Sequence, residues 1–217
     1  MNRIVKLALP AAIVTAALGA PGVARAATTT CHGHRATIVG TAGANTIVGT
    51  SWADVIVARG GNDTIRGRGG NDIICAGAGR DSVEGGRGSD HIYGGRGSDD
   101  LSGGGGSDTI AGGDGDDDVQ GDDGNDTLVG GAGDDQEHGG QGDDDEQGDE
   151  GADSLWGGFG ADSLSGGTGD DQLWGGCGND DEQGDAGDDT ISDDQGSDVE
   201  DGGDGNDTVD GVGDNQQ

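Results

Sequence analysis

Aspartate occurs at every ninth position through most of this chain of 217 residues. Eighteen consecutive nine-residue units, from Asp54 to Asp207, carry Asp at the same position, and ten units contain the complete hexapeptide Gly-Gly-x-Gly-x-Asp. Cysteine and histidine do not share this spacing, so oxygen is the ligand type that repeats. A regular array of carboxylates suits a hard divalent cation. Because Ca²⁺ accepts about 6–8 oxygen ligands in flexible geometry and Mg²⁺ requires a stricter octahedron, the pattern favours calcium.

A large apolar residue follows the aspartate by two positions in most units. It is Ile, Val or Leu in sixteen of the twenty units between residues 34 and 213, and Glu in the other four. Each apolar residue with its two neighbours predicts a strand of three residues. The glycine-rich hexapeptide predicts a chain reversal, because Gly tolerates the positive φ of turns. Alternate units then form two opposed parallel sheets, with eighteen residues per coil and neighbouring strands ~4.8 Å apart. Composition alone would also allow a disordered Gly/Asp-rich tract, but the constant phase favours the structured alternative.

Stacked coils place the aspartates of alternate units in columns. Asp90 is expected one coil below Asp108, and Asp108 one coil below Asp126. Carboxylates repeated at strand spacing repel one another. A divalent cation between successive turns, bound by Asp oxygens and turn carbonyls, would remove this repulsion.

These units resemble the haemolysin-type (RTX) calcium-binding nonapeptide repeat, and the resemblance extends in register over residues 34–213. It implies an all-β fold, namely a parallel β-roll (a right-handed two-sheet β-solenoid) with several Ca²⁺ ions in the GGxGxD turns. It also implies that the aspartate of each hexapeptide and turn carbonyls bind the ions. The aspartates at the matching positions are Asp63, Asp72, Asp81, Asp90, Asp99, Asp108, Asp117, Asp126, Asp135, Asp144, Asp153, Asp162, Asp171, Asp180, Asp189, Asp198 and Asp207.

Catalytic motifs do not stand out in the sequence. There is no obvious Ser/His/Asp or Cys/His arrangement, and a P-loop is excluded because the only lysine is Lys6. Relatives of this family often carry a catalytic or pore-forming region and a C-terminal export signal, and the sequence contains neither. We therefore expect a calcium-binding structural or interaction module rather than an enzyme.

Two alternative functions are weighed against this expectation. One is a cell-surface or partner-binding module that uses the outer face of the roll around Trp156 and Trp174. These residues are eighteen apart, and cross-strand packing of their rings is the simpler interpretation. The other is an extracellular enzyme. The identity of any protein or cell-surface partner stays open.

Residues 1–26 are predicted to form a secretory signal peptide. Arg3 and Lys6 precede an apolar stretch, and Ala24-Arg25-Ala26 provides small residues for cleavage near Ala26. The apolar stretch is shorter than the roughly 20 residues of a membrane span. The sequence thus predicts a secreted, extracellular protein with no membrane span.

The charge of the chain is strongly negative and unevenly distributed. The full sequence has a formal net charge of −34. Residues 27–96 contain seven arginines and six acidic residues, whereas residues 97–217 contain 38 acidic residues and neither Lys nor Arg. Such a chain repels nucleic acid and attracts cations. Dependence on calcium should therefore concentrate after Arg96.

The first units differ from those that follow. After a short N-terminal segment at residues 27–33, residues 34–60 are richer in β-branched residues and poorer in acids. This composition predicts a metal-poor cap that protects the first coil of the solenoid. Residues 61–213 are the predicted calcium-binding repeats, and residues 214–217 form a tail. A disulfide between Cys31 and Cys75 would join the cap to the third coil and leave Cys177 as a free thiol, although the sequence also allows other pairings.

Glutamate replaces the apolar residue at four core positions, namely Glu137, Glu146, Glu182 and Glu200. A carboxylate in a dry core is costly unless it is paired or neutralised. Either these carboxylates bind additional cations, or the C-terminal coils are loose. The second alternative is favoured.

Overall fold

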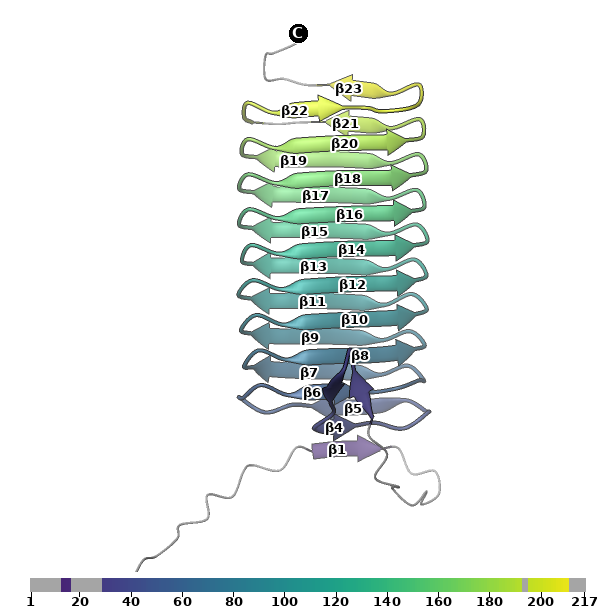
Figure 1. Ribbon diagram of the computed structural model, residues 1–217, viewed down its shortest axis with the longest axis vertical. Coiled ribbons are helices and arrows are strands. Elements are labelled where there is room, and N and C mark those ends of the chain that lie inside the picture. Colours follow the sequence, from purple (N-terminus) through teal and green to yellow (C-terminus); the bar gives the residue numbers. More distant parts are fainter. Residues whose placement is uncertain (1–12, 17–28, 193–194, 211–217) are drawn as a thin grey trace, which may run out of the picture.

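The computed structural model describes residues 13–16, 29–192 and 195–210, and its coils stack into a rod (Figure 1). Two parallel β-sheets face each other, and successive strands along the chain alternate between them. The predicted all-β, two-sheet parallel roll is therefore confirmed. Within the described part of the chain, no helix is long and apolar enough to cross a membrane.

The strands that follow one another in the first sheet are β5 (Asn45–Val48), β7 (Thr64–Gly69), β9 (Ser82–Arg87), β11 (Asp100–Gly105), β13 (Asp118–Asp123), β15 (Gln136–Gln141), β17 (Ser154–Phe159), β19 (Gln172–Cys177), β21 (Thr190–Ser192) and β23 (Thr208–Asp210). The second sheet contains β4 (Ile38–Val39), β6 (Val55–Val57), β8 (Ile73–Ala78), β10 (His91–Arg96), β12 (Thr109–Asp114), β14 (Thr127–Ala132), β16 (Asp145–Glu150), β18 (Ser163–Thr168), β20 (Asp181–Ala186) and β22 (Val199–Asp201). Neighbouring strands pair with a constant shift of eighteen residues, as in Ile92 with Ile110. The predicted coil length is thus confirmed.

The strands in the middle of the rod are longer than the sequence predicted. From β7 to β20 each has six residues instead of three, because it continues through the glycine pair of the next unit. In β10 the second glycine, Gly95, has φ 115° and still pairs with Gly113 of the next coil. The chain therefore bends inside the paired segment, and the turn that closes it needs only three residues, for example 97–99. Prediction from the apolar residue alone missed this extension.

The core is a double row of the apolar residues predicted to face inward. A first cluster of buried residues extends from Ile38 to Leu128, and a second contains Leu155, Leu164, Leu173 and Ile191. Glu137 on β15 and Glu146 on β16 occupy the core positions between the two clusters. The apolar core is thus interrupted by carboxylates in the middle of the rod.

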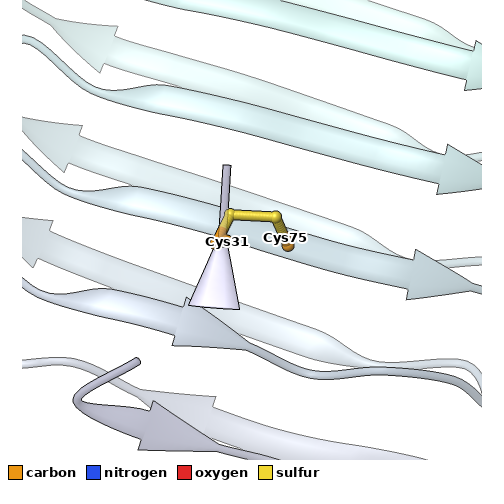
Figure 2. Close-up of a disulfide and its surroundings, with 2 residues drawn as sticks. All are labelled: Cys31 and Cys75. Carbon is orange, nitrogen blue, oxygen red and sulfur yellow. A yellow bond between two sulfur atoms is a disulfide. The ribbon is translucent and has the colours of Figure 1, made fainter. Parts of the chain in front are cut away.

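A small hairpin that the sequence analysis did not predict lies at the N-terminal end. Strands β2 (Thr30–Cys31) and β3 (His34–Arg35) pair antiparallel around a turn in which His32 and Gly33 have positive φ. A disulfide joins Cys31 of β2 to Cys75 of β8, with the Cα atoms 5.9 Å apart. Figure 2 shows this bridge between the short strand and the sheet. The pairing is the one expected from the sequence.

The free thiol expected at Cys177 is confirmed, and it is partly buried at the end of β19. Strand β1 (Ile13–Ala16) pairs antiparallel with β5 at the end of the first sheet. It falls inside the predicted signal peptide, and residues 1–12 and 17–26 of that segment lie outside the described residues. The predicted tail, 214–217, also lies outside them.

Candidate metal centres in the turns

Two columns of aspartates extend along the rod, one on each edge where the chain passes between the sheets. The backbone N–H of Asp90 donates to Oδ1 of Asp108 at 2.7 Å, and the N–H of Asp108 donates to Oδ1 of Asp126 at 2.7 Å. The same bond links residues eighteen apart from Asp54 to Asp198 in one column. It also links those from Asp63 to Asp207 in the other column. The predicted stacking of the turns is therefore present, and one oxygen of each stacked carboxylate is used to hold it.

The second oxygen of these carboxylates has no hydrogen-bond partner. At every ninth residue from Asp63 to Asp198, Oδ2 is buried and accepts no hydrogen bond within the described residues. Asp207, the last predicted ligand, is only partly buried. Because an unpaired buried carboxylate oxygen is costly, a cation or a proton is required at these positions.

At every ninth residue from Asp90 to Asp189, the unpartnered Oδ2 faces the first glycine of its own unit, whereas Ala58 and Ala76 occupy this position in the units of Asp63 and Asp81. A methyl group added to Gly85 would lie 2.6 Å from Asp90 Oδ2 and 2.7 Å from the carbonyl oxygen of Gly103, one coil further on. A methyl group added to Gly94 would lie 2.6 Å from Asp99 Oδ2 and 2.6 Å from the carbonyl oxygen of Gly112, one coil further on. A carboxylate oxygen and a carbonyl oxygen thus converge beside a glycine that has no side chain.

This donor set contains oxygen only, which fits Ca²⁺ rather than a softer metal. The described residues contain no group of three or more His, Cys, Asp and Glu side chains that could hold a metal ion. A metal ion in a turn would therefore rely on backbone carbonyls of the stacked turns in addition to Asp carboxylates. Such an arrangement would make each centre depend on its neighbours.

The cap turns satisfy their side chains without a cation. The backbone N–H of Thr50 and its hydroxyl donate to Oδ2 of Asp54 at 2.7 and 2.9 Å. In the preceding turn, Thr41 donates in the same way to Oδ1 of Asn45, at 3.1 and 3.0 Å. Both threonines replace the second glycine of the hexapeptide. Sequence analysis missed this signal, which distinguishes the cap from the turns that begin with Asp63.

Burial raises the pKa of the turn carboxyls, and the neighbouring aspartates of the column raise many of them further. The pKa rises to about 7 for Asp72, Asp99, Asp108, Asp135 and Asp162. It rises to about 6 for Asp117, Asp126, Asp153 and Asp171. For Asp108, burial is followed by the charges of Asp90 and Asp126, while the backbone N–H of Asp90 lowers the pKa. Without a counterion, these groups resist ionisation.

Three of the four core glutamates are completely buried. Glu137, Glu146 and Glu182 are each 0% exposed, whereas Glu200 on β22 is partly exposed. Burial and then the charge of Asp162 raise the pKa of Glu146 to about 8, and burial followed by the charge of Glu146 raises that of Glu137 well above its ordinary value. The expected loosening is not seen at these three residues, because their strands keep six residues. Shorter strands begin only at β21.

The aromatic residues predicted on the outer face stack on one another. The rings of His138 and Trp156 have centroids 4.3 Å apart and an interplanar angle of 6°, and those of Trp156 and Trp174 are 4.8 Å apart at 2°. Both faces of the Trp156 indole are therefore covered by neighbouring rings. The predicted cross-strand packing is confirmed, and it leaves this ring little free face for a partner.

Comparison with protein families gives a match along the whole repeat region. A family model described as RTX calcium-binding nonapeptide repeat (4 copies) matches residues 36–51, 48–83, 76–110, 111–146, 147–182 and 183–215. No curated protein matches the chain.

Proposed function

This chain belongs to the RTX calcium-binding nonapeptide repeat family, and on that premise we propose that it is a secreted protein whose roll is folded by calcium. The observation that carries the proposal is the row of buried, unpartnered Oδ2 atoms from Asp63 to Asp198. The Asp carboxylates and the carbonyl oxygens of the first glycines would hold the ions. Bound calcium supplies the positive charge that the chain lacks after Arg96.

The protein's own residues prepare the sites. Oδ1 is fixed by the backbone N–H of the preceding coil, for example Asp90 N to Asp108 Oδ1 at 2.7 Å, so the carboxylate cannot rotate away from the pocket. From Asp90 to Asp189, the glycine at the first position leaves the space into which Oδ2 points. Because each carboxylate is linked to the turns above and below it, binding at one turn should favour binding at its neighbours.

The proposed role is structural or interactive, without chemistry of its own. Secretion is part of the proposal and rests on the sequence of residues 1–26, whose cleavage near Ala26 would leave a chain with seven arginines as its only cationic side chains apart from histidine. A mass measurement of the exported protein should give a mature N-terminus close to Ala27. Recovery of the full-length chain outside the cell would contradict this part of the proposal.

Calcium titration tests the central claim. Metal-free protein at pH 7.5 should gain β-sheet circular dichroism cooperatively as calcium is added, and isothermal calorimetry should report multiple ions per chain. Magnesium at the same concentration should have a much smaller effect, because it retains its water ligands. A β-sheet signal that is already complete in excess EGTA would contradict folding by calcium. A screen for hydrolase activity in the presence of calcium would test the non-catalytic assignment.

A further inference from the structure

In units with an apolar core residue, the terminal methyl group of that residue lies next to the space beside the first glycine, into which the turn aspartate points. This space is called the turn pocket below. A methyl group added to Gly85 would lie 3.2 Å from Cδ1 of Ile92, the core residue of the same unit. At Gly94 the equivalent atom is Cδ1 of Leu101, also at 3.2 Å. The core side chain thus forms the apolar wall of the pocket into which the turn aspartate points.

Glu146 replaces this apolar wall with a carboxylate. A methyl group added to Gly139 would lie 2.6 Å from Glu146 Oε1, 2.6 Å from Asp144 Oδ2 and 2.8 Å from the carbonyl oxygen of Gly157. Three oxygens, two of them from carboxylates, therefore converge where other units have two oxygens and a methyl group.

The unit that contains Glu182 has the same arrangement. A methyl group added to Gly175 would lie 2.6 Å from Glu182 Oε1 and 2.7 Å from Asp180 Oδ2. The backbone N–H of Gly175 also donates to Glu182 Oε1 at 2.5 Å, which holds this carboxylate at the pocket. Two units of the roll thus place a second acid beside the turn aspartate.

In their ionised form, these paired acids require a positive charge that the Lys-free and Arg-free region around them does not provide. Glu146 is 0% exposed, and both of its carboxylate oxygens, like Asp144 Oδ2, are buried without a hydrogen-bond partner. Residues 97–217 contain neither Lys nor Arg. Two ionised carboxylates buried beside each other are strongly unfavourable unless a cation lies between them. The second carboxylate therefore points to an ion at this pocket and not to a packing defect.

We propose that Asp144 with Glu146, and Asp180 with Glu182, each form a two-carboxylate calcium site that binds the ion more tightly than the one-carboxylate turns. The proposal rests on the proposed function, since it assumes that the turns bind calcium. Affinity in oxygen-ligand sites rises with the number of charged ligands. These two pockets should therefore fill first when calcium is limiting, in the part of the rod where the apolar core is interrupted.

The test compares charge-neutralising variants in the full-length protein, titrated with Ca²⁺ alone in a calorimeter. Wild type should show a small class of tight sites followed by a larger weaker class. In Glu146→Gln/Glu182→Gln, the dissociation constant of the tight class should rise by about tenfold or more. Glu150→Gln is the matched control, because Glu150 is an exposed acid on the same strand as Glu146.

A second variant keeps the test informative if the glutamines disturb the core. Glu146→Leu/Glu182→Leu restores the apolar wall found in the Leu101 unit, so it should fold at lower calcium yet still lack the tight class. Loss of the tight class in this variant but not in Glu150→Gln supports the proposal. If wild type and both double variants have the same binding isotherm, the two-carboxylate sites are overturned while calcium binding by the turns stands. If wild type binds no calcium, the proposed function itself fails.

Discussion

The aspartate of each turn uses its two oxygens differently. Oδ1 accepts a backbone N–H from the preceding coil, as in Asp90 N to Asp108 Oδ1 at 2.7 Å. Oδ2 of Asp108 is buried and has no partner within the described residues. In the cap, by contrast, Thr50 supplies two donors to Oδ2 of Asp54. The same residue type at the same repeat position therefore has its second oxygen satisfied by donors in the cap and left without donors in the middle of the rod.

This contrast provides a matched pair of substitutions. Asp108→Asn removes the charge from an unpartnered Oδ2, so we expect fewer calcium ions per chain and a higher calcium midpoint for folding. Asp54→Asn changes a carboxyl whose Oδ2 already has donors, so the stoichiometry and midpoint should stay close to wild type. Calorimetry and circular dichroism of both variants give these values. Equal losses of calcium in the two variants would show that calcium is not bound at the hexapeptide turns.

The raised pKa values of the turn carboxyls predict how the metal-free protein responds to pH. Their pKa is about 7 in the roll for Asp72, Asp99, Asp108, Asp135 and Asp162, and about 4 in an unfolded chain. The folded state therefore binds more protons than the unfolded state between these values, so stability falls as pH rises from about 4 through about 7.

Acidification should thus partly replace calcium. In EGTA, the β-sheet signal should increase as the pH is lowered from 8 to 5, whereas with calcium it should be present at both values. Calcium affinity should rise as the pH is raised from 5 to 8, because bound protons must leave the carboxyls before the ion is held. Circular dichroism across the pH series measures both effects. A metal-free protein that loses β structure on acidification would contradict the predicted sign.

At the scale of elements, the N-terminal end is stabilised by a disulfide and by a hairpin whose ring contacts reach a further coil. The hairpin of β2 and β3 is joined to β8 by the Cys31–Cys75 disulfide. The ring of His32 stacks on Tyr93 of β10, with centroids 3.7 Å apart, and fixes the hairpin to a further coil. These contacts cover the first coils, where the turns have fewer carboxylates.

Removing the disulfide should weaken the cap specifically. In calcium-loaded Cys31→Ser/Cys75→Ser, opening of the coils from β4 to β8 should become easier by up to about 4 kcal/mol, the chain-entropy value for a loop of this size. The sequence separation of the two cysteines is 44. Native-state hydrogen exchange at the amides of these strands measures the change. Cys177→Ser removes the free thiol instead and should leave this protection unaltered. An equal loss of protection along the whole rod would contradict a local role.

At the scale of the whole molecule, charge divides the rod into two regions. Residues 27–96 carry nearly balanced charges, and Arg66 lies 3.2 Å from Glu84 across neighbouring coils. Residues 97–217 contain 38 acids without Lys or Arg. The apolar core is continuous from Ile38 to Leu128 and is then interrupted by Glu137 and Glu146. We therefore expect folding to depend on calcium most strongly in this second region, where charge balance and apolar burial are both poorest.

Removal of calcium by a chelator should unfold the C-terminal part of the rod and leave the N-terminal part folded. In excess EGTA at pH 7.5, amides of strands after Arg96 should lose protection from hydrogen exchange, while those of β5 to β9 should keep a substantial part of theirs. The cause is that coils contact only their neighbours, so the cap region does not need the distant ions. Hydrogen exchange with mass spectrometry resolves the two regions. Loss of protection at the same calcium concentration throughout the chain would indicate a single cooperative unit instead.

The repeat in the sequence was sufficient to predict the fold because residues eighteen apart must stack when strands pair at a constant spacing. That relation determined the core row from Ile38 to Ile191, the aspartate columns, and the pairing of Trp156 with His138 on one side and Trp174 on the other. It also predicts a metal-poor cap at the nearly neutral end of the chain and calcium dependence in the acidic part after Arg96.

Only the tertiary structure decided which atoms meet within a stacked unit. Sequence spacing places Asp54 and Asp108 at the same offset, but the Thr50 donors are what satisfy Asp54. Spacing shows only that Glu146 occupies a position where other units have an apolar core residue. The structure shows that its Oε1 lies beside Asp144 Oδ2 at Gly139. The reason is physical. Periodicity fixes the position of each backbone residue along the rod, while side-chain direction and the φ values of the turn determine which oxygens are paired and which are left for a cation.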